Sequence, residues 1–120
     1  MSDTKQMVKP AVATPELDLV HLSPPVDIYE NDNEVLIVAD MPGVTPDMTT
    51  VRLEPPRLLL EGRPPRHAQE RAVLYERVFR VSDDIDPNGI AAHIEAGVLS
   101  VHLKKSDASK PRRIEVRAGK

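Results

Sequence analysis

The chain has 120 residues, a formal net charge of −3 at neutral pH and no cysteine. This length is typical of one domain with short arms, because single domains usually run to about 100–150 residues. The lack of cysteine excludes a disulfide framework, a thiolate nucleophile and a Cys-based zinc site. No apolar run approaches the ~20 residues of a membrane span, and the first ten residues lack a signal-peptide apolar centre. We therefore expect a cytoplasmic protein without a membrane partner.

Charge is distributed unevenly along the chain. Residues 104–120 carry seven Lys or Arg against Asp107 and Glu115, a balance of +5, whereas the other 103 residues have a balance of −8. The basic end is interpreted as a solvated tail. Nucleic acid is not an expected partner, because the body is acidic and no aromatic residues interleave the basic ones to form a stacking platform.

The chain reads as short strands after an irregular start. Residues 1–24 are polar or weakly apolar and contain Pro10, Pro15 and Pro24, so we expect a flexible N-terminal arm. Alternating or apolar runs then predict strands, and clusters of turn formers separate them. The predicted strands are 26–30, 34–40, 50–54, 57–62, 73–81 and a pair flanking Gly97; the connections are 31–33, a single helical turn at 45–48, 63–71 and 82–89.

Seven or so short strands with turn signals at sandwich spacing, and no long helical period, predict an all-β fold. Twelve prolines argue further against long helices. The expected architecture is an immunoglobulin-like antiparallel β-sandwich over residues 25–104, with a flexible C-terminal tail over residues 105–120.

Four segments, in order and at natural spacing, resemble one protein family. They are P-V-D-I-Y-E at 25–30, A-D-M-P-G-V at 39–44, I-D-P-N-G-I-A-A at 85–92 followed by Gly97-Val98-Leu99, and K-P-R-R-I-E-V at 110–116. Together they are similar to the α-crystallin domain of small heat-shock proteins, with Gly97, Val98 and Leu99 as its signature turn. The resemblance implies an α-crystallin domain and an ATP-independent, stress-response chaperone that holds partially unfolded client proteins.

The chain departs from that family pattern at three places. Ala96 stands where Asn or Asp is usual, so the turn lacks a residue that tolerates the left-handed conformation. Lys104-Lys105 stands where many members carry a proline. The connection over residues 63–74 is too short for the extra strand that bacterial members usually exchange with a partner subunit. The usual bacterial dimer is therefore not expected.

The resemblance implies a docking role for the tail. Ile114 and Val116 are two residues apart, so both point the same way on an extended segment. By resemblance they insert into a groove of a neighbouring subunit, formed by Val51 and Leu53 on one strand and by Ala92 and Ile94 on another. The alternative is that residues 114–116 form a last ordinary strand of the same sandwich. We expect a homo-oligomer, either a dimer or a small assembly.

Tyr75, Arg77 and Phe79 resemble the end of the family's inter-strand segment and form a possible dimer interface. Two interpretations of Arg77 stay open. It is either a solvent-facing cation stacked on the neighbouring rings, or an interface residue paired with an acid across the dimer.

No residues in the sequence point to an active site or a cofactor. His93 and His102 face each other across the predicted hairpin, but a metal needs three or four converging ligands. No phosphate-binding glycine array or G-x-S-x-G motif is present. We therefore expect no enzyme, no cofactor and no metal. The rival interpretation is a monomeric adaptor of the related CS-domain co-chaperone class, which binds one specific protein partner and has no use for a tail docking motif.

Overall fold

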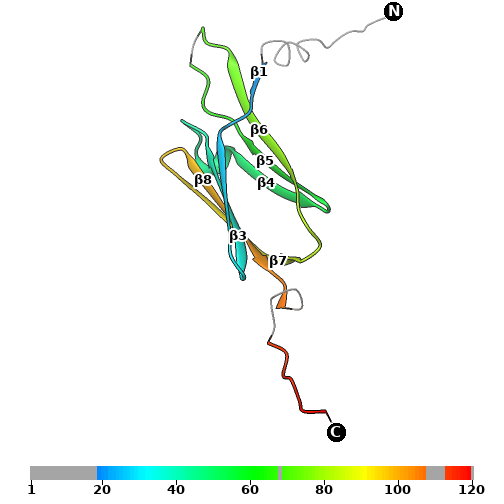
Figure 1. Ribbon diagram of the computed structural model, residues 1–120. Helices are drawn as coiled ribbons and strands as arrows, with labels where there is room; N and C mark the ends of the chain where they lie inside the picture. The colour runs from blue at the N-terminus through cyan, green and yellow to red at the C-terminus, as the bar shows by residue number, and fades with distance from the viewer. Residues whose placement is uncertain (1–18, 68, 108–112, 120) are drawn as a thin grey trace, which may run out of the picture.

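The computed structural model describes residues 19–67, 69–107 and 113–119. In these residues the chain forms eight strands and one short 3-10 helix, arranged as two packed layers (Figure 1). The elements are β1 (Leu19–Leu22), β2 (Val26–Glu30), β3 (Glu34–Asp40), η3 (Pro46–Met48), β4 (Thr49–Glu54), β5 (Arg57–Gly62), β6 (Ala72–Arg80), β7 (Ile85–Glu95) and β8 (Val98–Lys105).

Each layer is a four-stranded sheet. The first sheet has the strand order β1-β6-β5-β4 and the second has the order β2-β3-β8-β7. Every pairing is antiparallel except that of β1 with β6, which is parallel. The prediction of an all-β, largely antiparallel sandwich is confirmed.

The core between the sheets is almost entirely aliphatic. Alternation along each strand places every second residue inward, so Leu58 and Leu60 of β5 face the partner sheet with no exposed surface. Tyr75 and Phe79 only pack against the margin of this core. Full burial of an aliphatic side chain such as Leu58 or Leu60 stabilises the fold by roughly 1.5–3 kcal/mol. The main inward contributors from the other sheet are Ile37, Ala39, Leu99, Val101 and Leu103.

The end of the predicted N-terminal arm is part of a sheet. Residues 19–22 form β1, which runs parallel to Ala72–Tyr75 of β6. Leu19 and Val20 are half-buried there. A parallel partner of this kind covers backbone groups that β6 otherwise leaves unpaired at the sheet edge. The boundary expected at residue 25 is thus too late by at least six residues, and residues 1–18 lie outside the described part of the chain.

Strand β7 begins earlier than the sequence indicates. Residues 82–89 are predicted as a loop, but β7 starts at Ile85, with an irregular register between Ile85 and Ile90. The Asp86 carboxylate accepts a hydrogen bond from the Asn88 backbone N–H (2.9 Å). The turn formers therefore produce a bulge within the strand instead of a loop before it.

The last strand ends at the predicted start of the tail. The Lys105 backbone N–H donates to the Asn33 carbonyl (2.8 Å), and its ammonium lies 2.6 Å from a Glu30 carboxylate oxygen. The hydrogen bond that the Lys105 ammonium donates to the Glu30 carboxylate raises the pKa of Lys105 above its ordinary value. These contacts fix the point from which the C-terminal segment leaves the sandwich.

The signature turn joins β7 to β8 through two residues with positive φ, Ala96 at 52° and Gly97 at 77°. Its glycine packs against the A-D-M-P-G-V motif: the Met41 N–H donates to the Gly97 carbonyl at 2.6 Å. A Cβ on Gly97 would lie 3.0 Å from the Pro42 Cα, against backbone that cannot move aside. Two motifs more than fifty residues apart in sequence thus meet at one end of the sandwich.

Replacing Ala96 by Asn is expected to stabilise the protein by about 0.5–1 kcal/mol, because Asn tolerates the left-handed region better than Ala does. Chemical denaturation measures the change. Gly97→Ala is the opposing control and lowers stability through the contact with Pro42. Equal stability of Ala96→Asn and the parent chain would show that the turn holds no strain at this position.

Candidate functional site

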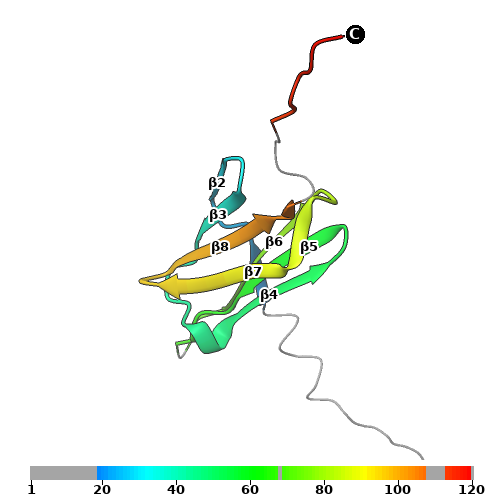
Figure 2. The same ribbon diagram turned by 90° about the horizontal axis from the view of Figure 1, so that it is seen from below.

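Both sheets end in an edge strand at the same rim of the sandwich. Strand β4 is the last strand of one sheet and β7 the last strand of the other. Figure 2 shows β7 and β4 side by side, with the short helix η3 at one end of the gap between them. An edge strand carries backbone N–H and C=O groups without a partner in its own sheet. The rim therefore combines free hydrogen-bonding groups with the inward-facing side chains of both sheets.

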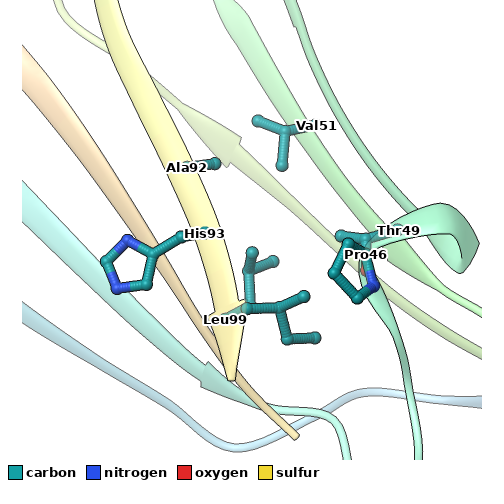
Figure 3. Close-up of a pocket in the computed structure, with 7 residues that line it drawn as sticks. Pro46, Thr49, Val51, Ala92, His93 and Leu99 are labelled. Atoms are coloured by element: carbon teal, nitrogen blue, oxygen red, sulfur yellow. The ribbon is translucent and has the colours of Figure 1, made fainter.

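A first hollow of about 230 Å³ opens between the two edge strands. Val51 lies on one side and Ala92 on the other, as Figure 3 shows, and Ile94 of β7 also lines the hollow. Leu99, which is 1% exposed, contributes from the neighbouring strand. The remaining residues that line the hollow are Pro46, Thr49 and His93. Its lining is predominantly aliphatic, so it suits a branched apolar side chain.

A second hollow of about 200 Å³ lies farther along the same rim. Leu53, two residues after Val51 on β4, lines it together with Ile85, where β7 begins. The other lining residues are Pro55, Pro56, Val81, Ser82, Asp83 and Pro87. Side chains two apart on a strand are separated by about 7 Å, so the two hollows follow each other along one face of β4.

The four predicted groove residues are thus distributed over two hollows. Val51, Ala92 and Ile94 line the first, and Leu53 lines the second. Sequence reasoning did not find Pro46, Thr49 or His93 as lining residues. The Met-Pro-Gly-Val turn followed by Thr45-Pro46 was the available signal, because it predicts a helical turn directly before β4.

The predicted docking motif lies outside both sheets. Residues 113–119 carry no strand, and Ile114 and Val116 are 82% and 90% exposed. Figure 1 shows this C-terminal segment extending away from the sandwich. The alternative, in which residues 114–116 form a last strand of the same sandwich, is therefore wrong for this structure. Two branched aliphatic side chains, two residues apart, are instead presented to solvent.

The register of β6 places Tyr75, Arg77 and Phe79 opposite Gly62, Leu60 and Leu58, all of which are buried. These three side chains therefore lie on the inner face of the sheet. Their role at a dimer interface stays a prediction. Because these side chains face the other sheet, a second subunit could contact them only by approaching along the edge of β6.

Arg77 makes its described contacts within the chain. Its guanidinium lies 5.1 Å from the centroid of the Phe79 ring, and Nη1 donates to the carbonyl of buried Pro24 (3.2 Å). The ring contact expected for Arg77 is present, but the side chain is half-buried on the inner face of the sheet and is not solvent-facing. The hydrogen bond also fixes Pro24, which connects β1 in one sheet to β2 in the other.

His93 and His102 stack across the β7–β8 hairpin, with ring centroids 5.9 Å apart. Nδ1 of His102 lies 3.2 Å from a Glu34 carboxylate oxygen on β3. Within residues 19–67, 69–107 and 113–119 no group of three or more candidate ligands converges on a metal position. The pair is a cross-strand contact on the outer face of its sheet.

Comparison with known proteins identifies the family. The model of the Hsp20/alpha crystallin family matches residues 27–117. A probable 15 kDa heat shock protein from Leptospira interrogans is 32% identical over 107 residues, which cover 81% of this chain and 80% of the relative. Small heat shock protein C4 from Rickettsia felis is 27% identical over 79% of this chain and 64% of its own length.

Solved structures agree with this assignment. A small heat-shock protein from Xylella fastidiosa superposes with a TM-score of 0.63 at 30% identity, over 81% of this chain and 98% of that one. The hspA protein of Xanthomonas axonopodis gives a TM-score of 0.60 at 28% identity, over 70% and 94%.

The two-sheet sandwich and its rim are those of an α-crystallin domain, and the chain belongs to the Hsp20/alpha crystallin family. Members of this family are ATP-independent chaperones and not enzymes, so the prediction of a non-enzymatic chaperone class is confirmed. They bind unfolded clients and form oligomers. Among the described residues no helix is long and apolar enough to cross a membrane.

Replacing Arg77 by Ala is expected to destabilise the fold by about 1–3 kcal/mol, because it removes a charge-assisted hydrogen bond and a cation–π contact together. Thermal and denaturant unfolding measure the loss. Arg71→Ala, at an exposed position just before β6, is the matched control and should change stability by less than about 0.5 kcal/mol. Equal effects of the two substitutions would contradict the assigned contact.

Proposed function

We propose that this protein is a holdase that assembles reversibly by inserting Ile114 and Val116 of one subunit into the β4–β7 rim of another. The observation that carries the proposal is that one chain has both two exposed aliphatic side chains in its tail and a rim with two aliphatic hollows. The similar protein from Xylella fastidiosa is described as having a distinct high-order structure, which also supports assembly.

The spacing of the two tail side chains equals the spacing of the two hollows along β4, which supports the proposed docking. Ile114 and Val116 are two residues apart, so on an extended tail their side chains project to the same side about 7 Å apart. Val51 of the first hollow and Leu53 of the second have the same separation along β4. One aliphatic side chain therefore fills each hollow, and Glu115 between them projects to solvent.

The energy of such a contact makes it exchangeable. Burying two branched side chains contributes roughly 3–6 kcal/mol, and immobilising the tail costs several kcal/mol of this. A single docked tail is therefore weakly bound. Assembly becomes avid only when several tails dock at once, and each tail still dissociates readily.

Release of a tail makes the rim available to other chains. Partially unfolded proteins expose apolar side chains and unpaired strand edges. A client segment then occupies the hollows that a tail has left and pairs with the edge backbone of β4 or β7. No nucleotide is needed, because docking and release are equilibrium steps. Residues 1–24 contain no Phe or Trp, so we expect weaker client binding than a relative with an aromatic-rich arm shows.

Ile114→Ser combined with Val116→Ser is expected to lower the average mass of the assembly, because the tail loses most of its apolar burial in the rim. Ala92→Phe should do the same by filling the first hollow. Multi-angle light scattering on the intact chains measures both. Arg113→Ser/Arg117→Ser is the matched tail control, and Ala91→Phe, exposed on the other face of β7, is the matched groove control.

Mixing the two defective chains identifies the acceptor. The tail variant keeps an intact rim and the Ala92→Phe chain keeps an intact tail, so together they should form a one-to-one complex absent from either alone. A mixture that scatters as the sum of its parts would mean that the tail docks on its own subunit or nowhere on the rim.

An aggregation assay separates the holdase from the monomeric adaptor. The intact protein at equimolar ratio is expected to delay thermal aggregation of a model client, because its rim takes up exposed apolar segments. Ala92→Phe should weaken this protection severalfold and Ala91→Phe should leave it unchanged. No delay by the intact protein would favour the adaptor, which binds one specific partner.

A further inference from the structure

The outer face of the β4-β5-β6 sheet is divided into charged and apolar rows. The core-facing residues of β5 are Leu58 and Leu60, so Arg57, Leu59 and Glu61 point away from the core. The strand register extends these three positions into rows across the sheet. The rows are Glu54–Arg57–Arg80, Arg52–Leu59–Val78 and Thr50–Glu61–Glu76.

The middle row is apolar on β5 and β6. Leu59 lies directly opposite Val78, which is 54% exposed. A shallow hollow of about 150 Å³ on this face is lined by Leu59 and Val78 together with the charged residues Arg52, Glu54 and Arg57. Single exposed apolar residues are ordinary, but here they lie between two rows of opposite charge.

Each flanking row places like charges opposite each other. Arg57 faces Arg80 on one side of the apolar row, and Glu61 faces Glu76 on the other. Like charges directly opposite on antiparallel strands repel each other. None of these four side chains has an ion pair or side-chain hydrogen bond within the described residues, whereas Arg52 is paired with Glu54 at 2.9 Å. Glu54 is opposite Arg57 on β4, but its carboxylate is paired with Arg52, so among the described residues no opposite charge contacts either like-charge pair.

We propose that this face binds the same face of a second copy of the chain. A two-fold axis in the plane of contact, running along the Leu59–Val78 row, reverses the direction of the strands. Arg57 of each copy then lies against Glu61 of the other, and Arg80 lies against Glu76. Leu59 and Val78 meet their own symmetry mates, and so does Arg52, whose charge is compensated within each copy by Glu54 at 2.9 Å. Such self-complementarity is the property that an isologous interface requires.

The area of the face limits its strength. Three strands about 4.8 Å apart and three rows about 7 Å apart cover roughly 300 Å², against about 800 Å² per partner in a standard stable complex. The contact is therefore a weak one, and salt weakens it because Arg57 and Arg80 are exposed and Glu61 and Glu76 are only half-buried. It uses neither the tail nor the β4–β7 rim, so it is independent of the proposed docking function.

Charge reversal tests the proposal. All chains carry Ile114→Ser/Val116→Ser, so that tail docking does not contribute, and association is measured by sedimentation equilibrium at low salt. Arg57→Glu/Arg80→Glu makes the face acidic throughout, and Glu61→Arg/Glu76→Arg makes it basic. Each chain alone should self-associate roughly tenfold more weakly than the parent. Arg66→Glu/Arg71→Glu, on the 63–71 connection, has the same charge change as the acidic chain and should not weaken association.

Two restorations make the test specific. An equimolar mixture of the acidic and basic chains should form a heterodimer that neither chain forms with itself. The chain with all four reversals should self-associate like the parent, because the polarity is inverted in both copies. Failure of both restorations would overturn the proposal, even if the single charge reversals weaken association.

Cross-linking provides a second measurement that does not depend on charge. The parent has no cysteine, so a chain with Val78→Cys carries one thiol close to the symmetry axis. Facing sheets lie about 10 Å apart, and a short bis-maleimide spans that distance. We expect efficient cross-linking of Val78→Cys and little of Val98→Cys, which is exposed on the other sheet. Equal yields at both positions would also contradict the proposal.

Discussion

The structure depends on one constraint, which is that two open sheets packed face to face leave two unpaired edges at a common rim. Strands β4 and β7 occupy this rim, and nothing in the described part of the chain pairs with their outer backbone groups. Closure into a barrel would remove such edges. Because the sandwich stays open, its aliphatic interior reaches solvent through two hollows, and the proposed docking function rests on that access.

The other edges of the sandwich are managed differently. The edge of β6 is covered in part by β1, which pairs with residues 72–75 only. The short loop of residues 23–25 between β1 and β2 crosses between the sheets, and Arg77 holds it by donating to the Pro24 carbonyl. The short connection between β5 and β6 carries no strand in its described residues.

Much of this architecture was predictable because local signals and tertiary structure agree. Alternation at 26–30 and 50–54 and the apolar run within 57–62 marked strands that are found there. The prediction was wrong where local chemistry allowed two outcomes. Leu19–Leu22 reads as a weak apolar segment, and only the presence of the β6 edge makes it a strand. The turn formers at 85–89 read as a loop, yet pairing with β8 draws them into β7 as a bulge.

The groove shows the same division between local and long-range information. The tail motif and the signature turn were visible in sequence, and family resemblance supplied the groove strands. Sequence did not indicate that Leu53 lines a different hollow from Val51, nor that Pro46, Thr49 and His93 contribute. The first hollow depends on how η3 packs beside β7, and the second on how the start of β7 packs beside the end of β4; no local pattern encodes either arrangement.

By itself the amino-acid sequence determined the strand content, the aliphatic character of the core and the separation of an acidic body from a basic tail, because periodicity, composition and charge are local properties. The tertiary structure decided which strands form the rim, how its hollows are spaced and which charges share a row on a sheet face. These depend on register and packing between segments distant in sequence, and a shift of one residue in register would exchange the two faces of a strand.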